Sequence, residues 1–132
     1  MNLSEILKLK KKSIVSIVGS GGKTTLMYLL GNELKLENRV LLSTTTKIYA
    51  PKGNESDFLA IGSDDYNHIK NLKYNGIYVY GASKNDEGKL IGINKEDIEK
   101  CISDFDYTIV EADGSKKKAY KGMEWMGTCY LW

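Results

Sequence analysis

The sequence is poor in residues on which several protein classes depend. Its 132 residues include two cysteines, Cys101 and Cys129, and one histidine, His68, too few for a disulfide framework or a Cys/His zinc cluster. The single proline and the 27% of charged residues argue against a disordered chain. The longest apolar runs are about five residues, against the roughly 18 of a membrane span, and no apolar block suits a signal peptide. We expect a globular, cytoplasmic protein with no membrane partner.

An excess of charge of one sign is also lacking. Nineteen lysine and arginine residues stand against seventeen aspartate and glutamate residues, a net charge of +2. So balanced a chain does not favour nucleic acid as a partner. Lysine runs at 10–12 and 116–118 are typical of solvated faces, although the second run could also meet an anionic substrate.

Predicted strands alternate with predicted helices along the chain. Short apolar, β-branched runs predict strands at residues 13–18, 40–44, 58–61, 77–80, 90–93 and 107–110, with a turn at 85–88. Apolar residues at helical spacing predict helices at 3–9, from about residue 64, and along two stripes: Leu26, Leu29, Leu30 and Leu34, then Ile98, Cys101, Ile102 and Phe105. This alternation predicts an α/β fold with a mainly parallel sheet flanked by helices. The glycine-rich loop at residues 17–25 makes the expected fold P-loop NTPase-like.

The segment IVGSGGKTT, residues 17–25, lies between a predicted strand and a predicted helix, the context that a phosphate-binding loop requires. Glycines let backbone N–H groups point at phosphate oxygens, and the helix N-terminus adds partial positive charge. We expect Lys23 to reach the β- and γ-phosphates of ATP or GTP, Thr24 to bind Mg²⁺, and Thr25 to bind a further phosphate oxygen. The expected nucleotide-binding residues of this loop are Gly19, Ser20, Gly21, Gly22, Lys23, Thr24 and Thr25.

The loop is shorter than the standard Walker pattern, G-x-x-x-x-G-K-[ST]. Ile17 stands where that pattern has its first glycine, and the sequence reads G-x-x-G-K-T-T, a spacing like that of the Mur ligases. An ATP-dependent ligase or kinase is therefore an alternative to an NTPase. A glycine-rich turn beside a solvated lysine is the alternative without function.

An acidic segment, YTIVEADG at residues 107–114, follows another predicted strand. Glu111 ends the apolar run, where a carboxylate that organises a metal would lie, and Asp113 is a second candidate for the metal or the attacking water. We assign Lys23, Glu111 and Asp113 to catalysis, and Thr24, Glu111 and Asp113 to Mg²⁺. The competing interpretation is a strand that ends in a solvated Asp-Gly turn.

A third polar group follows the second predicted strand. Ligands bind at the carboxyl ends of parallel strands, so Thr44, Thr45, Thr46 and Lys47 are expected to face the phosphates, the last three as nucleotide-binding residues. The preference of threonine for strands explains the same cluster equally well.

Residues 94–97 match the guanine-reading motif N-K-x-D, but they precede the E-x-x-G of residues 111–114 instead of following it. Asn94 is also a good helix cap. The sequence therefore does not choose between ATP and GTP.

Together these segments resemble the selenium-dependent hydroxylase accessory proteins, also called selenium cofactor biosynthesis proteins. The resemblance rests on IVGSGGKTTLMYLLGNEL, RVLLSTTTKIYAP, GKLIGIN and YTIVEADGSKKKAYKG, and it covers residues 14–122. It implies a cytoplasmic, nucleotide-binding accessory factor for selenium-dependent molybdenum hydroxylases. The implied partner is such a hydroxylase or one of its maturation proteins.

The last residues depart from that family. Its members continue after EADGSK with a Glu-Pro-Val-Ile stretch, whereas this chain reads MEWMGTCYLW, and a reading frame shifted by one base can restore that stretch. We expect residues 1–122 to be the N-terminal part of a longer P-loop domain and residues 123–132 to be a frameshifted tail. A non-catalytic nucleotide-binding fragment is then a third alternative, since the only arginine, Arg39, is expected at the sheet end opposite the phosphates.

Overall fold

The computed structural model describes residues 9–19, 22–112 and 128–131. In chain order its elements are β1 (Ser13–Gly19), α2 (Lys23–Leu34), β2 (Arg39–Thr44), β3 (Lys47–Tyr49), β4 (Phe58–Ile61), α3 (Ser63–Ile69), β5 (Gly76–Gly81), β6 (Ser83–Lys84), β7 (Lys89–Ile91), α4 (Lys95–Cys101), the 3-10 helix η1 (Ile102–Asp104), β8 (Tyr107–Glu111) and β9 (Thr128–Leu131). The predicted helix at residues 3–9 lies outside the described residues.

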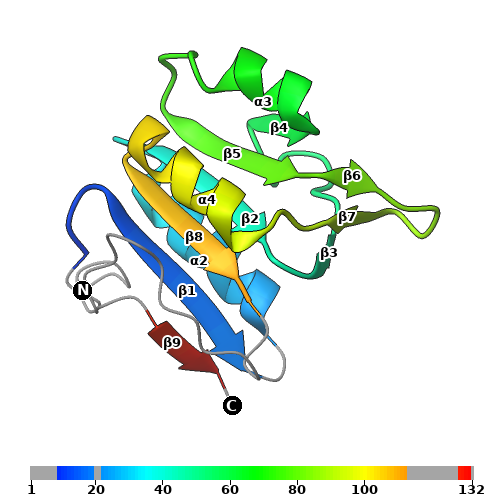
Figure 1. Ribbon diagram of the computed structural model, residues 1–132. Coiled ribbons are helices and arrows are strands. Elements are labelled where there is room, and N and C mark those ends of the chain that lie inside the picture. Colours follow the sequence, from blue (N-terminus) through cyan, green and yellow to red (C-terminus); the bar gives the residue numbers. More distant parts are fainter. Residues whose placement is uncertain (1–8, 20–21, 113–127, 132) are drawn as a thin grey trace.

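Six strands form one sheet in the order β4-β5-β2-β8-β1-β9, and every neighbouring pair is parallel. In Figure 1, α4 lies on the near face of this sheet, α2 lies behind it, and α3 lies beside β4 and β5. The predicted α/β class with a mainly parallel sheet is confirmed.

Each face of the sheet has its own apolar core. On one face, α2 packs Met27, Leu30 and Leu34 against inward side chains of β1, β2, β5 and β8. On the other face, α3, α4 and the residues after η1 cover the alternate side chains of the same strands, and this core includes aromatic rings in stacked and edge-on contact. Side chains of successive strand residues point to opposite faces, so a strand with a core on both sides is apolar throughout.

The buried stripe of α2 differs from the predicted one. Leu29 is 56% exposed, and the buried positions are Met27, Leu30, Gly31 and Leu34. Gly31 is the reason, because it brings the helix close to β2 and β5: a Cβ there would lie 3.4 Å from Leu42 and Ile77 side-chain atoms. Glycine does not count as an apolar residue in such a pattern, so the predicted stripe included the exposed Leu29 and missed the buried Gly31.

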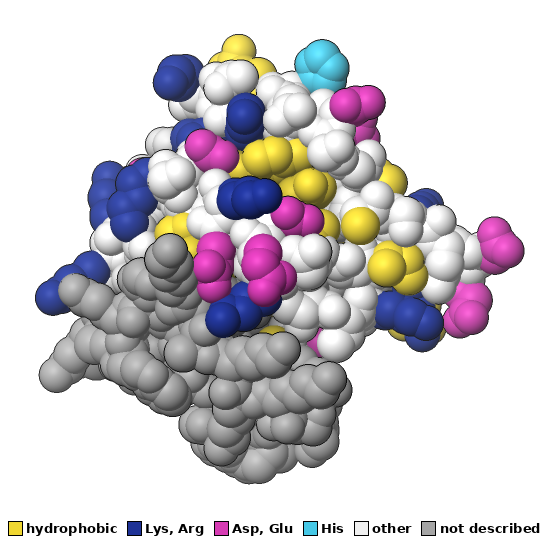
Figure 2. Space-filling view, in the orientation of Figure 1, with side chains coloured by type: hydrophobic (Ala, Val, Ile, Leu, Met, Phe, Trp, Pro, Cys, Tyr) yellow, Lys and Arg dark blue, Asp and Glu magenta, His cyan; other side chains and the backbone are white. Residues whose placement is uncertain are grey.

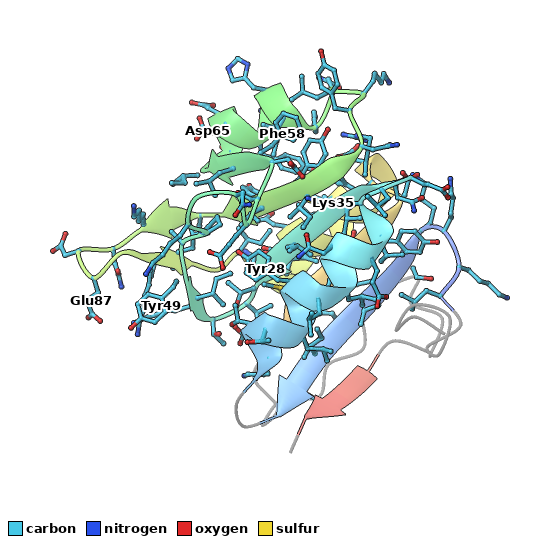
Figure 3. All side chains as sticks on the ribbon, turned by 180° about the vertical axis from the view of Figure 1, so that it is seen from behind. Tyr28, Lys35, Tyr49, Phe58, Asp65 and Glu87 are labelled. Atoms are coloured by element: carbon cyan, nitrogen blue, oxygen red, sulfur yellow. The ribbon has the colours of Figure 1, made fainter. Side chains whose placement is uncertain are left out.

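Three short strands form a separate antiparallel sheet in the order β3-β7-β6. Figures 1 and 3 show it projecting beyond the end of β5, with Tyr49 and Glu87 on it. The predicted turn at 85–88 is confirmed, because the Asn85 side chain accepts hydrogen bonds from the amides of Glu87 and Lys89. The strand predicted at 90–93 spans Lys89–Ile91 instead, and it belongs to this small sheet.

The structure also tests the predicted helix cap and the predicted core cysteine. Asn94 caps α4, accepting a 2.8 Å hydrogen bond from the Asp97 amide, and Cys101 is buried in the core as expected. β9, within the expected tail at 123–132, pairs with β1 from Ser16 opposite Thr128. None of the helices in the described ranges combines the length and the apolar character that a membrane crossing requires.

Candidate functional site

The register of the parallel strands places the carboxyl ends of β1, β2 and β8 side by side. Glu111, the last residue of β8, stands opposite Ile17 of β1 and Thr44 of β2. Beyond it, the Ala112 amide donates to the Ile17 carbonyl at 2.9 Å, and the Thr45 amide donates to the Glu111 carbonyl at 3.1 Å. The carboxyl ends of β1, β2 and β8 therefore lie level at one edge of the sheet.

The start of α2 lies at the same edge. Gly22, its N-cap residue, has a φ of +72°, a left-handed conformation that favours glycine. Lys23 is the first helical residue, and Thr24 and Thr25 follow it. No side chain caps this N-terminus and no acidic residue lies in the first turn, as far as the described residues go. Among the residues that the structure describes, the first amides of α2 thus have no side-chain acceptor.

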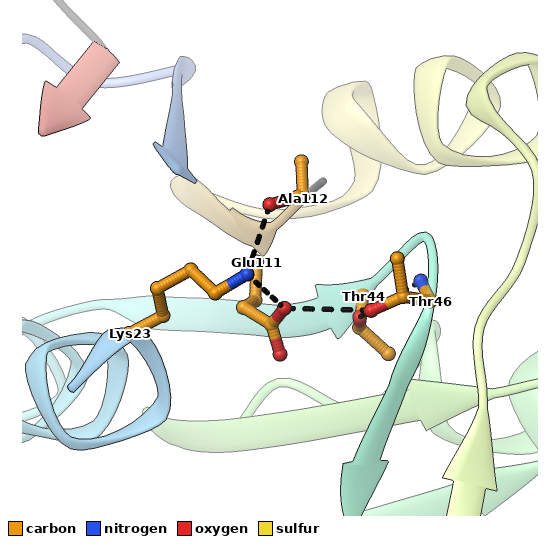
Figure 4. A network of polar contacts seen from close by, with 5 residues as sticks. All are labelled: Lys23, Thr44, Thr46, Glu111 and Ala112. Carbon is orange, nitrogen blue, oxygen red and sulfur yellow. Dashed lines mark hydrogen bonds and ion pairs between the residues drawn. The ribbon is translucent and has the colours of Figure 1, made fainter. Parts of the chain in front are cut away.

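Lys23 and Glu111 form an ion pair across this edge (Figure 4). The Lys23 Nζ atom lies 3.2 Å from Glu111 Oε1 and 3.3 Å from the Ala112 carbonyl oxygen. The Lys23 side chain is 21% exposed and that of Glu111 only 6%. A buried carboxylate is costly without a cation, so Lys23 supplies the charge that Glu111 needs.

Two threonines complete the polar network around Glu111. The Thr46 hydroxyl lies 3.4 Å from Glu111 Oε1 and 3.3 Å from the Thr44 hydroxyl, while the Thr46 amide donates to Thr44 Oγ1 at 3.0 Å. The Gly92 amide donates to the Thr46 carbonyl at 2.7 Å. The turn between β2 and β3 is thereby fixed to both β8 and the segment after β7.

The structure gathers some of the predicted site residues and separates others. Lys23, Thr46 and Glu111 are in contact, with Thr24 and Thr25 on the adjoining helical turn. Lys47 begins β3 on the small antiparallel sheet, and its side chain is exposed. Ser20, Gly21 and Asp113 lie outside the described residues.

Sequence reasoning missed the structural parts played by Gly92 and the Ala112 carbonyl. A Cβ at Gly92 would overlap the Thr44 carbonyl oxygen and lie 2.7 Å from the Thr45 carbonyl carbon. A glycine inside a predicted strand, here the one predicted at residues 90–93, is a known sign of close backbone approach, so the signal for Gly92 was present. Every residue has a backbone carbonyl, so no sequence signal could have identified that of Ala112.

The donor set fits one kind of metal site. Within the described ranges, no group of three or more His, Cys, Asp and Glu side chains could hold a metal ion. Mg²⁺, however, is commonly held by one or two carboxylates together with substrate phosphates. Glu111 lies at the edge where α2 begins, so it would suit such a shared site, with Thr24, the second residue of α2, as a further oxygen donor, and not a cage made by protein alone.

The opposite end of the sheet holds Arg39, as predicted. Its guanidinium lies over the rings of Tyr78 and Phe105, 5.0 Å and 4.7 Å from their centroids, and donates to the carbonyls of Lys70 and Asp104. Arg39 therefore fastens the amino end of the sheet.

Over the centre of the face seen in Figure 2, basic side chains (lysine or arginine) lie beside acidic ones (aspartate or glutamate).

Comparison with known proteins gives two matches. A family model described as YqeC protein matches residues 15–125. The chain is 29% identical over 110 residues to a curated Escherichia coli (strain K12) protein named "Uncharacterized protein YqeC". That alignment covers 81% of this chain and 43% of the relative, so the chain spans less than half of the relative's length. No solved structure matches.

Proposed function

Because this chain belongs to the YqeC family, the selenium-dependent hydroxylase accessory proteins, we propose that it is a nucleotide-binding P-loop protein. In this proposal it acts as an NTPase accessory factor in the maturation of a selenium-dependent molybdenum hydroxylase or its selenium cofactor. The ligand is ATP or GTP with Mg²⁺, and the protein partner is the hydroxylase or another of its maturation proteins.

The contact between Lys23 and Glu111 carries the proposal. A nucleoside triphosphate site needs a cation for the β- and γ-phosphates and, close to it, a carboxylate for the metal. Here the first residue of the helix after a glycine-rich loop lies 3.2 Å from the last residue of the neighbouring strand. The left-handed Gly22 and the uncapped N-terminus of α2, among the described residues, support a phosphate at the same place.

Each residue has one role in the proposed site. Lys23 binds the β- and γ-phosphates, and the Thr25 hydroxyl binds a further phosphate oxygen. Mg²⁺, when bound, neutralises charge that develops on the transferred phosphoryl group. Glu111 and the Thr24 hydroxyl, together with Asp113, hold that ion. Thr45, Thr46 and Lys47, which the sequence assigns to nucleotide binding, follow β2, and of the three the Thr46 hydroxyl contacts Glu111.

A binding titration combined with a phosphate-release assay tests this function. The purified chain is titrated with ATP and with GTP, in Mg²⁺ and in chelator, and phosphate release is followed in the same samples. Binding in Mg²⁺ with slow release and no added acceptor supports the NTPase accessory function. If neither nucleotide binds in Mg²⁺, the proposal is wrong.

The G-x-x-G-K-T-T spacing favours a second candidate, an ATP-dependent ligase or kinase. Phosphate release that requires an added small acceptor would support it. Binding without turnover would support a non-catalytic nucleotide-binding protein. A version in which residues 123–132 are replaced by the Glu-Pro-Val-Ile continuation expected from the family, assayed beside the present chain, tells whether this segment affects turnover.

A further inference from the structure

Thr46 is the hydroxyl residue in contact with the buried carboxylate of Glu111. Its Oγ1 lies 3.4 Å from Glu111 Oε1, longer than the roughly 2.5–2.7 Å of a strong hydroxyl–carboxylate hydrogen bond. The same carboxylate oxygen also faces Lys23 Nζ at 3.2 Å. Oε1 is thus shared between a cation and a hydroxyl, and the cation makes the shorter contact.

The backbone of Thr46 is held independently of Glu111. Its amide donates to Thr44 Oγ1 at 3.0 Å, and its carbonyl accepts from the Gly92 amide at 2.7 Å. Thr44 itself is fully buried, and its carbonyl accepts from the Ile93 amide at 3.0 Å. The backbone position of Thr46 is therefore set by the turn and does not depend on the cation that lies on Glu111.

The charge balance at Glu111 must change when a triphosphate arrives. Lys23 cannot serve both the phosphates and the carboxylate fully, and a carboxylate that is 6% exposed needs a replacement cation or strong hydrogen bonds. Thr46 is the remaining side chain in the described network that touches Glu111. When Lys23 leaves, the hydroxyl can bond to Oε1 without competition.

We propose that Thr46 is a positioning residue, which holds the Glu111 carboxylate in place while its cation changes from Lys23 to a divalent metal. This inference rests on the proposed nucleotide-binding function. Thr46 acts through Glu111, so its hydroxyl matters for metal-bound nucleotide and not for nucleotide without metal. A residue that merely supported the fold would affect both forms alike.

The test compares nucleotide affinity in Mg²⁺ with affinity in chelator, using ATP, and GTP as a second probe. Thr46→Val removes the hydroxyl at nearly constant shape, and Thr46→Ser keeps it. We expect Thr46→Val to reduce the gain in affinity that Mg²⁺ provides by at least fivefold, with the affinity in chelator unchanged within twofold. Thr46→Ser should retain most of the gain.

Thr108→Val is the matched control. The Thr108 hydroxyl is buried in β8 without a hydrogen-bond partner among the described residues, so the same chemical change there should leave both affinities unchanged. Thr46→Ala removes the hydroxyl without adding the second valine methyl, and it provides a second measurement if Thr46→Val does not fold.

The outcomes separate the two proposals. If wild type binds neither nucleotide in Mg²⁺, the proposed function and this inference both fail. If wild type binds and gains from Mg²⁺ but the Thr46 variants keep that gain, the inference alone fails. An equal loss of affinity in Mg²⁺ and in chelator also overturns it, because that result indicates a structural role.

Discussion

Lys23 and Glu111, the first residue of α2 and the last residue of β8, meet with Nζ 3.2 Å from Oε1. This ion pair joins the two segments that the sequence predicted to be functional. The two segments lie far apart in the chain, because the elements from β2 to η1 stand between them. Each group reduces the cost of burying the other, since a partly buried charge is stable only with a partner. Substitutions of Lys23 should therefore affect both the affinity for nucleotide and the free energy of unfolding.

Lys23→Ala should weaken triphosphate binding at least tenfold, about 1.4 kcal/mol, because a charge-assisted phosphate contact is lost. Titration with ATP and GTP in Mg²⁺ measures the change. Lys100→Ala, which removes an exposed lysine of α4, is the control and should bind as wild type does. Unchanged affinity in Lys23→Ala would reject the phosphate-loop assignment.

Lys23→Met should lower the free energy of unfolding without nucleotide by about 1–3 kcal/mol, because the Glu111 carboxylate then stays buried without its cation. Glu111→Gln in the same chain should recover part of this loss, since the amide carries no charge. Urea unfolding of the two single variants and the double variant measures the coupling. Additive single effects would show that the ion pair contributes nothing to stability.

Gly92→Ala should destabilise the protein by about 1–3 kcal/mol, since its Cβ would overlap the Thr44 carbonyl oxygen and the backbone would have to move. Gly31→Ala is the contrasting variant. Its Cβ would meet Leu42 and Ile77 at 3.4 Å, and alanine favours a helix, so its stability should stay within about 1 kcal/mol of wild type. Thermal unfolding of both distinguishes a backbone clash from an ordinary substitution. Equal effects would contradict the close approach at Gly92.

Tyr28→Phe should be neutral at pH 7 or stabilising by up to about 1 kcal/mol, because the buried Tyr28 hydroxyl lacks a hydrogen-bond partner among the described residues. Burial, helped by the charge of Glu55, raises the pKa of Tyr28 from 10.0 to about 12. Between these values the unfolded chain loses a proton that the folded chain keeps, so wild-type stability falls as pH rises.

The phenylalanine variant has no such proton, and its advantage over wild type should grow between pH 10 and 12 and be constant below pH 10. Denaturant unfolding at pH 7, 9 and 11 measures it. A constant difference across that series would show that the hydroxyl is not buried as described. Cys101, whose pKa burial raises to about 11, lowers the stability of both proteins at high pH and cancels in the comparison.

The chain should bind nucleotide and turn it over poorly. Positive groups that neutralise developing charge are worth several powers of ten in phosphoryl transfer. The only arginine of the sequence, Arg39, lies over the rings of Tyr78 and Phe105 at the far end of the sheet. Phosphate release at about 1 s⁻¹ or faster, with binding confirmed in the same sample, would contradict this prediction.

More of the fold than of the site contacts could be predicted from the sequence. Strands with cores on both faces are apolar throughout, so the positions of β1, β2, β5 and β8 followed from the sequence, and the edge strand β4 followed from its short apolar run. The small antiparallel sheet was not foreseen, since its strands have two or three residues, too few to show a period. Parallel pairing predicted that Glu111 and Thr44 lie side by side. The glycine at position 92 indicated a close backbone approach, but no local pattern identified Thr46, far away in the sequence, as the partner of its amide.

The position of β8 in the sheet has a consequence for the order of assembly. β8 lies between β1 and β2 and pairs with both, and these two strands do not pair with each other. During synthesis, then, β1 with α2 and β2 with β5 have no sheet in common until residues 107–111 leave the ribosome. Such non-local pairing is slow and leaves strand edges open in the meantime. The strand that closes this gap ends in Glu111, so a nascent chain acquires its continuous core and the carboxylate facing Lys23 in one event.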